Sequence, residues 1–282
     1  MTAATITQPR NVTAPTADRP RGRVTFAGLF HSEWIKTWSL RSTIWSLAVA
    51  VALMVGTTVL YAWGAAGDPS VDVSAAELIG PGGYFAQLVF AVLGVLTISG
   101  EYSTGQIRST LVAVPRRTPA LLAKAIVLVA VAVLTTVVAV ALAVCASMPF
   151  YGDLGTSLDL ADGETLRILA GMPLVVAGLA LFGFAIGAVV RSSPGALAVV
   201  LGMLLVVENV VTAIPLAFFD RIGPFLPSSA GNRLVYSQEV LDLQNSFTTG
   251  AHLTPWQGFG VLMTWVVVIG VLAAVLLRRR DA

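Results

Sequence analysis

The sequence predicts an all-α integral membrane protein with six transmembrane helices. Composition is the first indication, because 56% of the 282 residues are hydrophobic and only 11% are charged, whereas soluble domains carry about 25% charged residues. The second is a set of six apolar runs, each long enough for the about 20 residues that a helix needs to cross a bilayer. The third is that these runs lack the period-two alternation of a membrane-spanning barrel.

The two ends of the chain are predicted to lie outside the membrane. Residues 1–23 are rich in Thr, Ala, Pro and Arg and have too little apolar surface to fold, so we expect a disordered cytoplasmic tail. They do not match a signal peptide, because the first apolar run starts too late and is too long. Residues 278–282 are predicted to form a short basic tail.

Residues 24–43 are predicted to form an amphipathic helix along the membrane surface. Its apolar and polar side chains fall broadly on opposite sides, as in interfacial helices, and its tryptophans favour the head-group region. The apolar side consists of Phe26, Leu29, Phe30, Trp34 and Trp38. Glu33 and Arg41 fall near that side, so we expect each to pair with the other or with another segment.

The six spans follow from the apolar runs. Five of them contain no charged residue, and the fifth in chain order contains only Glu208. The predicted spans are residues 44–66, 78–100, 125–152, 168–190, 192–219 and 253–277, and together they make a transmembrane domain over residues 44–277.

The basic residues indicate the orientation. Of the 17 Lys and Arg residues, 14 lie before the first span, after the second, after the fourth or after the sixth, and 3 lie in the other loops. Because basic loops remain on the cytoplasmic side, both termini are predicted to be cytoplasmic in a multi-pass protein of the cell membrane.

The loop after the second span reads GEYSTGQIRSTLVAVPRR, residues 100–117. Ser103 and Gln106 have the spacing of a capping box, and apolar residues recur at positions 107, 111 and 114, on one face of a helix that Pro115 would end. Two interpretations are open: a solvated connector on the lipid surface, or a docking element for a cytoplasmic partner.

This loop and the stretch HSEWIKTWSLRSTIWSL before the first span resemble the permease subunits of bacterial ABC-2 type exporters. The resemblance extends from about residue 24 to the end of the chain. It implies a connecting helix that contains Glu33, Trp34 and Lys36, and a coupling helix in the first cytoplasmic loop that meets the ATPase subunit. The implied coupling residues are Glu101, Tyr102, Ser103, Thr104, Gly105, Gln106, Ile107 and Arg108.

The resemblance also implies short re-entrant helices on the outer side, between the fifth and sixth spans. The sequence there is AIPLAFFDRIGPFLPSSAG, residues 213–231, in which Pro215, Pro224 and Pro227 interrupt an apolar stretch. It overlaps the end of the predicted fifth span. An ordinary outer loop with a proline turn is the alternative.

The sequence contains no glycine-rich loop followed by Lys and Ser or Thr, which an ATPase needs. The chain is therefore predicted not to be an enzyme and to hold no cofactor, with ATP and Mg²⁺ bound on a separate ABC ATPase subunit. The resemblance implies two permease copies, expected as a homodimer, with two such subunits in the lipid bilayer. No nucleic-acid partner is expected, and 1 cysteine and 2 histidines argue against a metal site.

Glu208 is the one charged residue inside a predicted span. A charge at the bilayer centre costs about 2.5–3.5 kcal/mol on insertion scales, so we expect this one to be neutralised, paired or in water. Either Glu208 and Asn209 line a path or carry protons near a dimer interface, or a protonated Glu208 hydrogen-bonds to a neighbouring helix. Gly178, Gly183 and Gly187 of the predicted fourth span are small residues that predict close helix packing and not a contact with substrate.

The function predicted from these features is that of an exporter permease that moves an unidentified substrate outward. The alternatives are a proton-coupled secondary transporter, for which Glu208 is the candidate coupling residue, and a non-transporting membrane partner of an ATPase. An intramembrane enzyme is disfavoured, because no histidine and no pair of carboxylates lies within a predicted span.

Overall fold

The computed structural model describes residues 25–68, 70–103, 105, 117–214 and 216–280. These residues form helices joined by turns and loops, with no strand among them. Six helices in this part of the chain are long and apolar enough to cross a membrane. The predicted all-α class and the predicted number of candidate spans are therefore confirmed.

The candidate spans lie close to their predicted positions. They are α2 (Arg41–Ala66), α3 (Gly80–Ser103) with the preceding turn η1 (Glu77–Ile79), α5 (Arg117–Ser147) with the following turn η2 (Met148–Phe150), α6 (Gly163–Val190), the series α7 (Ser193–Leu201), η3 (Gly202–Val207) and α8 (Glu208–Ala213), and α12 (Pro255–Arg280). The fifth span ends at Ala213 and not at residue 219, so the predicted end is wrong. Ile214 is extended there, which is the conformation favoured before a proline.

The N-terminal amphipathic helix is α1 (Phe26–Ser39), which Thr25 caps by accepting a hydrogen bond from the Gly28 N–H at 3.2 Å. It is shorter than the predicted 24–43, because Leu40 is extended and the chain then starts α2. Phe30 and Trp34 pack against the bundle core. The apolar side of α1 thus faces the protein at these two positions.

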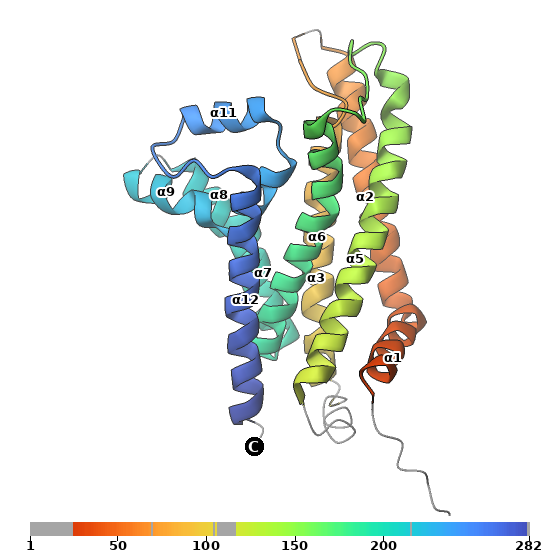
Figure 1. Ribbon diagram of the computed structural model, residues 1–282, viewed down its shortest axis with the longest axis vertical. Helices are drawn as coiled ribbons and strands as arrows, with labels where there is room; N and C mark the ends of the chain where they lie inside the picture. Colours follow the sequence, from red (N-terminus) through yellow and green to blue (C-terminus); the bar gives the residue numbers. More distant parts are fainter. Residues whose placement is uncertain (1–24, 69, 104, 106–116, 215, 281–282) are drawn as a thin grey trace, which may run out of the picture.

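The spans run side by side, and the two ends of the bundle differ (Figure 1). One end holds α1, the end of α3, the start of α5 and the end of α12, and we call it the α1 end. The opposite end holds α9 and α11 and is called the α11 end. The described helix ends that adjoin the N-terminal tail, the first predicted cytoplasmic loop and the C-terminal tail therefore lie at one end of the molecule.

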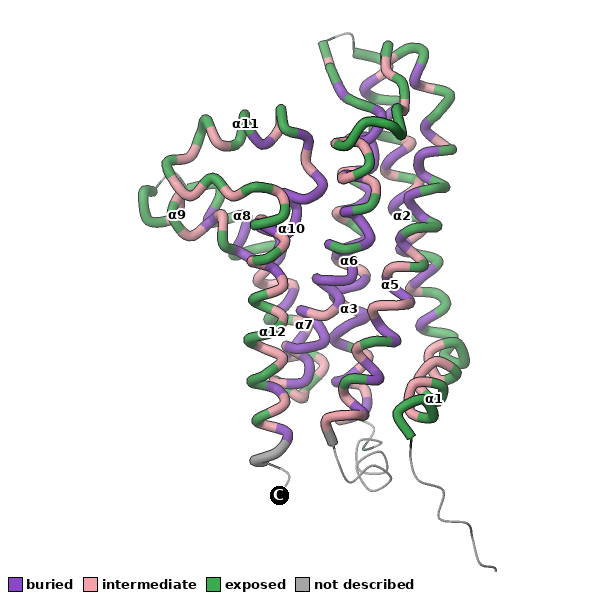
Figure 2. The backbone as a smooth tube through the Cα atoms, viewed as in Figure 1, coloured by how far each residue is buried: buried purple, intermediate pink, exposed green. Residues whose placement is uncertain are grey.

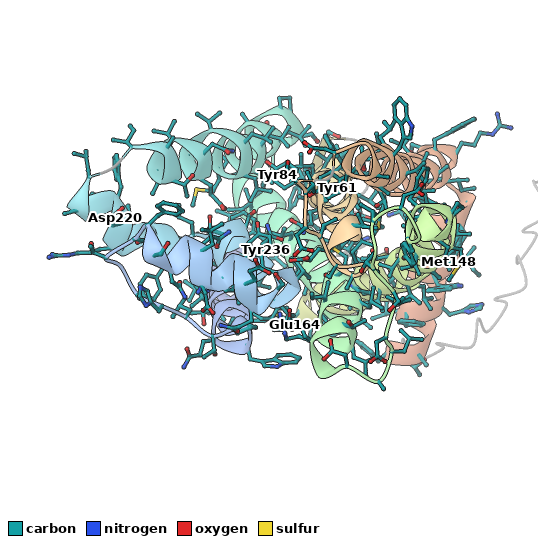
Figure 3. The ribbon with its side chains drawn as sticks, turned by 90° about the horizontal axis from the view of Figure 1, so that it is seen from above. Tyr61, Tyr84, Met148, Glu164, Asp220 and Tyr236 are labelled. Carbon is teal, nitrogen blue, oxygen red and sulfur yellow. The ribbon has the colours of Figure 1, made fainter. Side chains whose placement is uncertain are left out.

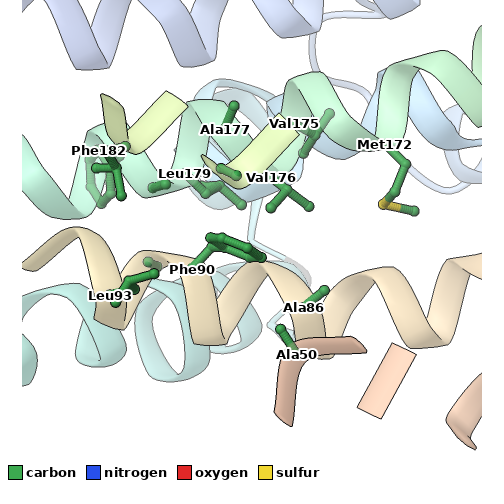
Figure 4. Packing of buried hydrophobic residues seen from close by; sticks show 14 of the residues in the cluster. Ala50, Ala86, Phe90, Leu93, Met172, Val175, Val176, Ala177, Leu179 and Phe182 are labelled. Atoms are coloured by element: carbon green, nitrogen blue, oxygen red, sulfur yellow. The ribbon is translucent and has the colours of Figure 1, made fainter. Parts of the chain in front are cut away.

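The centre of the bundle is formed by α3 and α6. In Figure 2 the buried positions concentrate on these two helices. Within the most apolar stretch of α6, 72% of the residues are buried, against 17% for α12. Phe90 of α3 packs among Val176 and Leu179 of α6 in the core shown in Figure 4. The outer helices leave wide apolar faces uncovered, as expected for a surface that meets lipid.

Glycines bring α3 and α6 together, as predicted for Gly183 and Gly187. A Cβ atom at Gly183 would collide with the backbone carbonyl of Ala91, and one at Gly187 would collide with α3 as well. Gly94 makes the reciprocal close approach from α3 to the backbone of α6. Gly178 faces α12 instead, where side chains fill the space.

Short helices fill the segment between the fifth and sixth spans. They are α9 (Ala217–Ile222), η4 (Gly223–Phe225), α10 (Pro227–Asn232), η5 (Arg233–Val235) and α11 (Gln238–Ser246). Pro224 lies in the first turn of η4 and Pro227 begins α10, since proline is compatible with a helix start and not with its interior. In Figure 1, α9 and α11 lie below the tips of α2 and α5 at the same end.

Asp162 caps α6 and gives a prediction about pH. Its Oδ2 accepts a hydrogen bond from the Thr165 N–H at 2.8 Å, and this bond lowers the pKa of the Asp162 carboxyl below its usual 3.8. A lowered folded-state pKa means that the stabilisation is present above the unfolded pKa and is lost as pH falls through the folded value. Asp162→Asn retains an N-cap acceptor but has no carboxyl to protonate. We therefore expect its melting temperature to fall less than that of the wild type between about pH 5 and 3. Melting temperatures of both proteins across that range would show it, and parallel pH profiles would contradict it.

Candidate functional site

Four charged side chains meet at the α1 end, where α1 crosses the ends of α3 and α5. The Lys124 Nζ of α5 lies 2.5 Å from Oε2 of Glu33 on α1 and 2.9 Å from Oε1 of Glu101 on α3. Lys36 of α1 forms a further ion pair with the same oxygen of Glu101. We call Glu33, Lys36, Glu101 and Lys124 the charge network.

The centre of the charge network is buried, and its charges balance. Glu101 and Lys124 are 3% and 4% exposed, so neither could hold its charge there without a partner. Two carboxylates face two ammonium groups, and each of the central pair contacts two opposite charges. The arrangement ties α1, α3 and α5 together at one point.

Tyr102, the next residue along α3, makes contact in another direction. The guanidinium of Arg191 lies 5.2 Å from the centre of the Tyr102 ring, within cation–π range. Arg191 occupies the turn between α6 and α7 with a left-handed φ of 59°, and its Nη2 donates to the Leu276 carbonyl of α12 at 3.3 Å. Two consecutive residues of α3 thus connect to α1 and α5 on one side and to α12 on the other.

The other implied coupling residues lie at or beyond the end of α3. Ser103 is the last residue of α3 and donates its hydroxyl to the Gly100 carbonyl. The predicted capping box of Ser103 and Gln106 stays a prediction, because Gln106 lies outside the described residues. Gly105 has a φ of 71°, and its N–H donates to the Tyr102 carbonyl, a geometry typical of a helix C-terminus. Thr104, Gln106, Ile107 and Arg108, with most of the predicted coupling helix, lie outside the described residues.

Glu33 pairs with another segment and not with Arg41, one of the two arrangements expected for it. Trp34 stacks on Phe30, with 6.1 Å between ring centres, and meets Trp38 edge-on. Lys124 was missed by the sequence reasoning, although a lone lysine one residue before a predicted span is a signal that could have been followed.

Glu208 lies at the other end of the molecule, directly after the π-helical stretch η3. It is 5% exposed, and its two oxygens accept hydrogen bonds from the N–H groups of Ser228 and Ser229 at 2.8 and 2.7 Å and from the Ser229 hydroxyl at 2.8 Å. Its partners therefore belong to the first turn of the short helix α10. Asn209 donates to the Leu205 carbonyl of its own span, so Glu208 and Asn209 do not bond to each other.

A cavity of about 470 Å³ adjoins Glu208. Its wall comes from the end of the fifth span, the short helices that follow it, and Tyr84 of α3. Charged and aromatic side chains on the wall are Tyr84, Glu208, Phe219, Asp220, Arg233, Tyr236 and Phe247. Figure 3 shows Tyr84, Asp220 and Tyr236 from the α11 end, each on a different element.

A chain of amide side chains attaches this wall to the bundle. The Gln87 Nε2 of α3 donates to the Asn232 Oδ1 at 2.7 Å, and the Asn232 Nδ2 donates to the Ser228 hydroxyl at 3.2 Å. Both amide residues are buried. The wall is therefore held by α3 as well as by Glu208.

The described residues contain no group of three or more His, Cys, Asp or Glu side chains that could hold a metal ion. A comparison with models of protein families gives no match, and no curated protein is significantly similar in sequence.

Proposed function

We propose that this chain is the membrane-spanning subunit of an ATP-driven exporter of the ABC-2 type, with ATP and Mg²⁺ bound on a separate ATPase subunit. The six candidate spans, the N-terminal amphipathic helix and the short helices after the fifth span support the proposal, because the resemblance of the sequence implies all three. In the proposed assembly two copies of the chain join two ATPase subunits, and the α1 end faces the cytoplasm.

The charge network is the observation that carries the proposal. Glu101 lies near the end of α3, before residues 104–116, and Lys124 lies near the start of α5, after them, so the network joins the two helices that this segment connects. A push on the segment would therefore reach α3 and α5 together, and α1 would move with them through Glu33 and Lys36. A permease without its own ATPase needs such a rigid connection, because movements of the ATPase subunit must be passed on to the membrane spans.

The test uses a charge reversal in the coupling segment. We expect Arg108→Glu to abolish co-purification of the chain with an ATPase that carries a glycine-rich phosphate-binding loop, because the resemblance assigns Arg108 to the coupling helix and a reversed charge would oppose docking there. Co-purification from native membranes, followed by mass spectrometry, measures this. Arg221→Glu is the matched control, since Arg221 lies on α9 at the opposite end.

An equal amount of ATPase with both variants would contradict the assigned contact. Solute transport driven by a pH gradient in liposomes that contain only this chain would favour the proton-coupled alternative instead. Binding of the ATPase without ATP-dependent transport would favour a non-transporting partner.

A further inference from the structure

The cavity at the α11 end has an excess of negative charge. Glu208 and Asp220 lie on its wall, and Arg233 is the only cationic residue there among the described residues. Arg233 is turned to other partners: its Nε donates to the Leu253 carbonyl at 2.7 Å, and its Nη2 donates to the Asn245 Oδ1 at 2.9 Å. It forms no ion pair with the part of the chain that the structure describes.

Within the described part of the chain, neither carboxylate pairs with a cation. Glu208 accepts hydrogen bonds from donors that carry no charge. From the described residues, the Asp220 carboxylate receives a single long hydrogen bond of 3.5 Å, donated by the Thr249 hydroxyl. No ion pair involves either residue within the described chain. The neutral donors favour the ionised form of Glu208 and its burial opposes that form, so a cation in the adjoining cavity would stabilise the carboxylate.

Tyr236 lines the same cavity as Glu208. Burial raises the pKa of the Tyr236 phenol first, and the negative charge of Glu208 raises it further. An ionised Glu208 therefore opposes ionisation of a phenol that lines the same cavity.

Aromatic rings complete the wall. Tyr84, Phe219, Tyr236 and Phe247 come from four different parts of the chain. Aromatic faces attract cations, and the attraction grows when the cation leaves water. The cavity volume of about 470 Å³ lies within the range of small-molecule sites, which is roughly 300–1,000 Å³. Both carboxylates and aromatic rings line it.

We propose that this cavity binds an organic cation, a protonated amine or quaternary ammonium group attached to a small apolar body. The cation faces Asp220 and Glu208, and the apolar body rests on the aromatic rings. Binding is a property of this chain alone and does not depend on an ATPase. Whether the bound cation is also the cargo rests on the proposed export function.

The experiment measures binding of two probes to the purified full-length chain in an uncharged detergent. Benzyltrimethylammonium and benzenesulfonate each carry one aromatic ring and one permanent charge, of opposite sign. We expect isothermal titration calorimetry to show saturable binding of the cation and none of the anion. In Asp220→Asn the affinity for the cation should fall about tenfold, because one of the two wall carboxylates is neutralised.

Asp242→Asn is the matched control, since Asp242 is exposed on α11, accepts a hydrogen bond from Gln238 and does not line the cavity. Its affinity should equal that of the wild type. Glu208→Gln provides a second test if Asp220→Asn fails to elute as a single folded species, and it should weaken binding as well. Equal binding of both probes, no saturable binding of the cation, or wild-type affinity in both wall variants would overturn the proposal. These results would leave the ATPase contact untouched, because that contact is tested at the opposite end.

Discussion

Replacing Lys124 by methionine is expected to lower the free energy of unfolding by about 3–5 kcal/mol, the usual cost of removing one partner from a buried ion pair. Methionine preserves much of the apolar stem of the lysine and removes the ammonium group. Glu33 and Glu101 would then lose the cation that both contact at 2.5 and 2.9 Å, and Lys36 alone would face Glu101. The variant is expected to release α1, because the contact of Glu33 with α5 is lost.

Equilibrium unfolding in mixed micelles, followed by circular dichroism, measures this change. Tryptophan emission provides a second signal, since Trp34 and Trp38 lie on α1 and should become more exposed to water. Lys36→Met is the matched control: the Lys36 side chain is 29% exposed, against 4% for Lys124, so water should replace much of what is lost. Equal effects of the two substitutions would show that burial of Lys124 is not what matters.

A double substitution separates the charge from the packing. Glu101→Met combined with Lys124→Met removes one negative and one positive charge, and buried pairs replaced by apolar residues are often neutral in stability. We expect the double variant to recover most of the stability that Lys124→Met loses. A loss equal to the sum of the two single variants would contradict this expectation.

The membrane spans could be predicted from the sequence because the signal is local. An apolar run of sufficient length predicts a span whatever it packs against, and the charge asymmetry grouped the segments of the α1 end correctly without any knowledge of contacts. The boundary that failed, at the end of the fifth span, lies where the apolar composition continues beyond the helix. There Pro215 follows an extended Ile214, and backbone geometry overrides hydrophobicity.

The charge network could not be predicted, because its contacts are not local. Lys124 lies 91 residues from Glu33 and 23 from Glu101 in the chain. In a count of basic residues Lys124 contributes only to the predicted orientation. The count does not predict which helix Lys124 contacts. Glu33 was recognised as misplaced on the apolar side of α1, which is the signature of a partner, but a helical pattern does not name that partner.

The partners of Glu208 could not be predicted either, for a different reason. Its charge within a span marked it as a residue that needs partners, but most of those partners are backbone N–H groups, which leave no residue type to recognise. Pro227 was the available signal, since proline favours the first turn of a helix and the N–H groups that follow it, here those of Ser228 and Ser229, lack helical acceptors.

Replacing Gly183 by alanine is expected to destabilise the protein by about 1–3 kcal/mol, the usual cost of overpacking a core. The added Cβ would meet the backbone carbonyl of Ala91, which has no rotamer to escape into, so α3 and α6 would have to separate. The same contact is made in reverse by Gly94 against the carbonyl of Ala180. Separation of these helices would also strain the position of Glu101 at the end of α3, so the charge network should loosen with them.

Gly56→Ala is the matched control for this substitution. A Cβ at Gly56 meets nothing within 4 Å, and the residue lies on the exposed face of α2. Alanine is more favourable than glycine in a helix by roughly 0.8–1.0 kcal/mol, so this variant should be as stable as the wild type or more stable. Unfolding in mixed micelles would compare the two, and opposite signs are expected from the same chemical change. Destabilisation by Gly56→Ala as large as that by Gly183→Ala would mean that close approach of α3 and α6 does not explain the glycine, because only one of the two positions has a backbone against it.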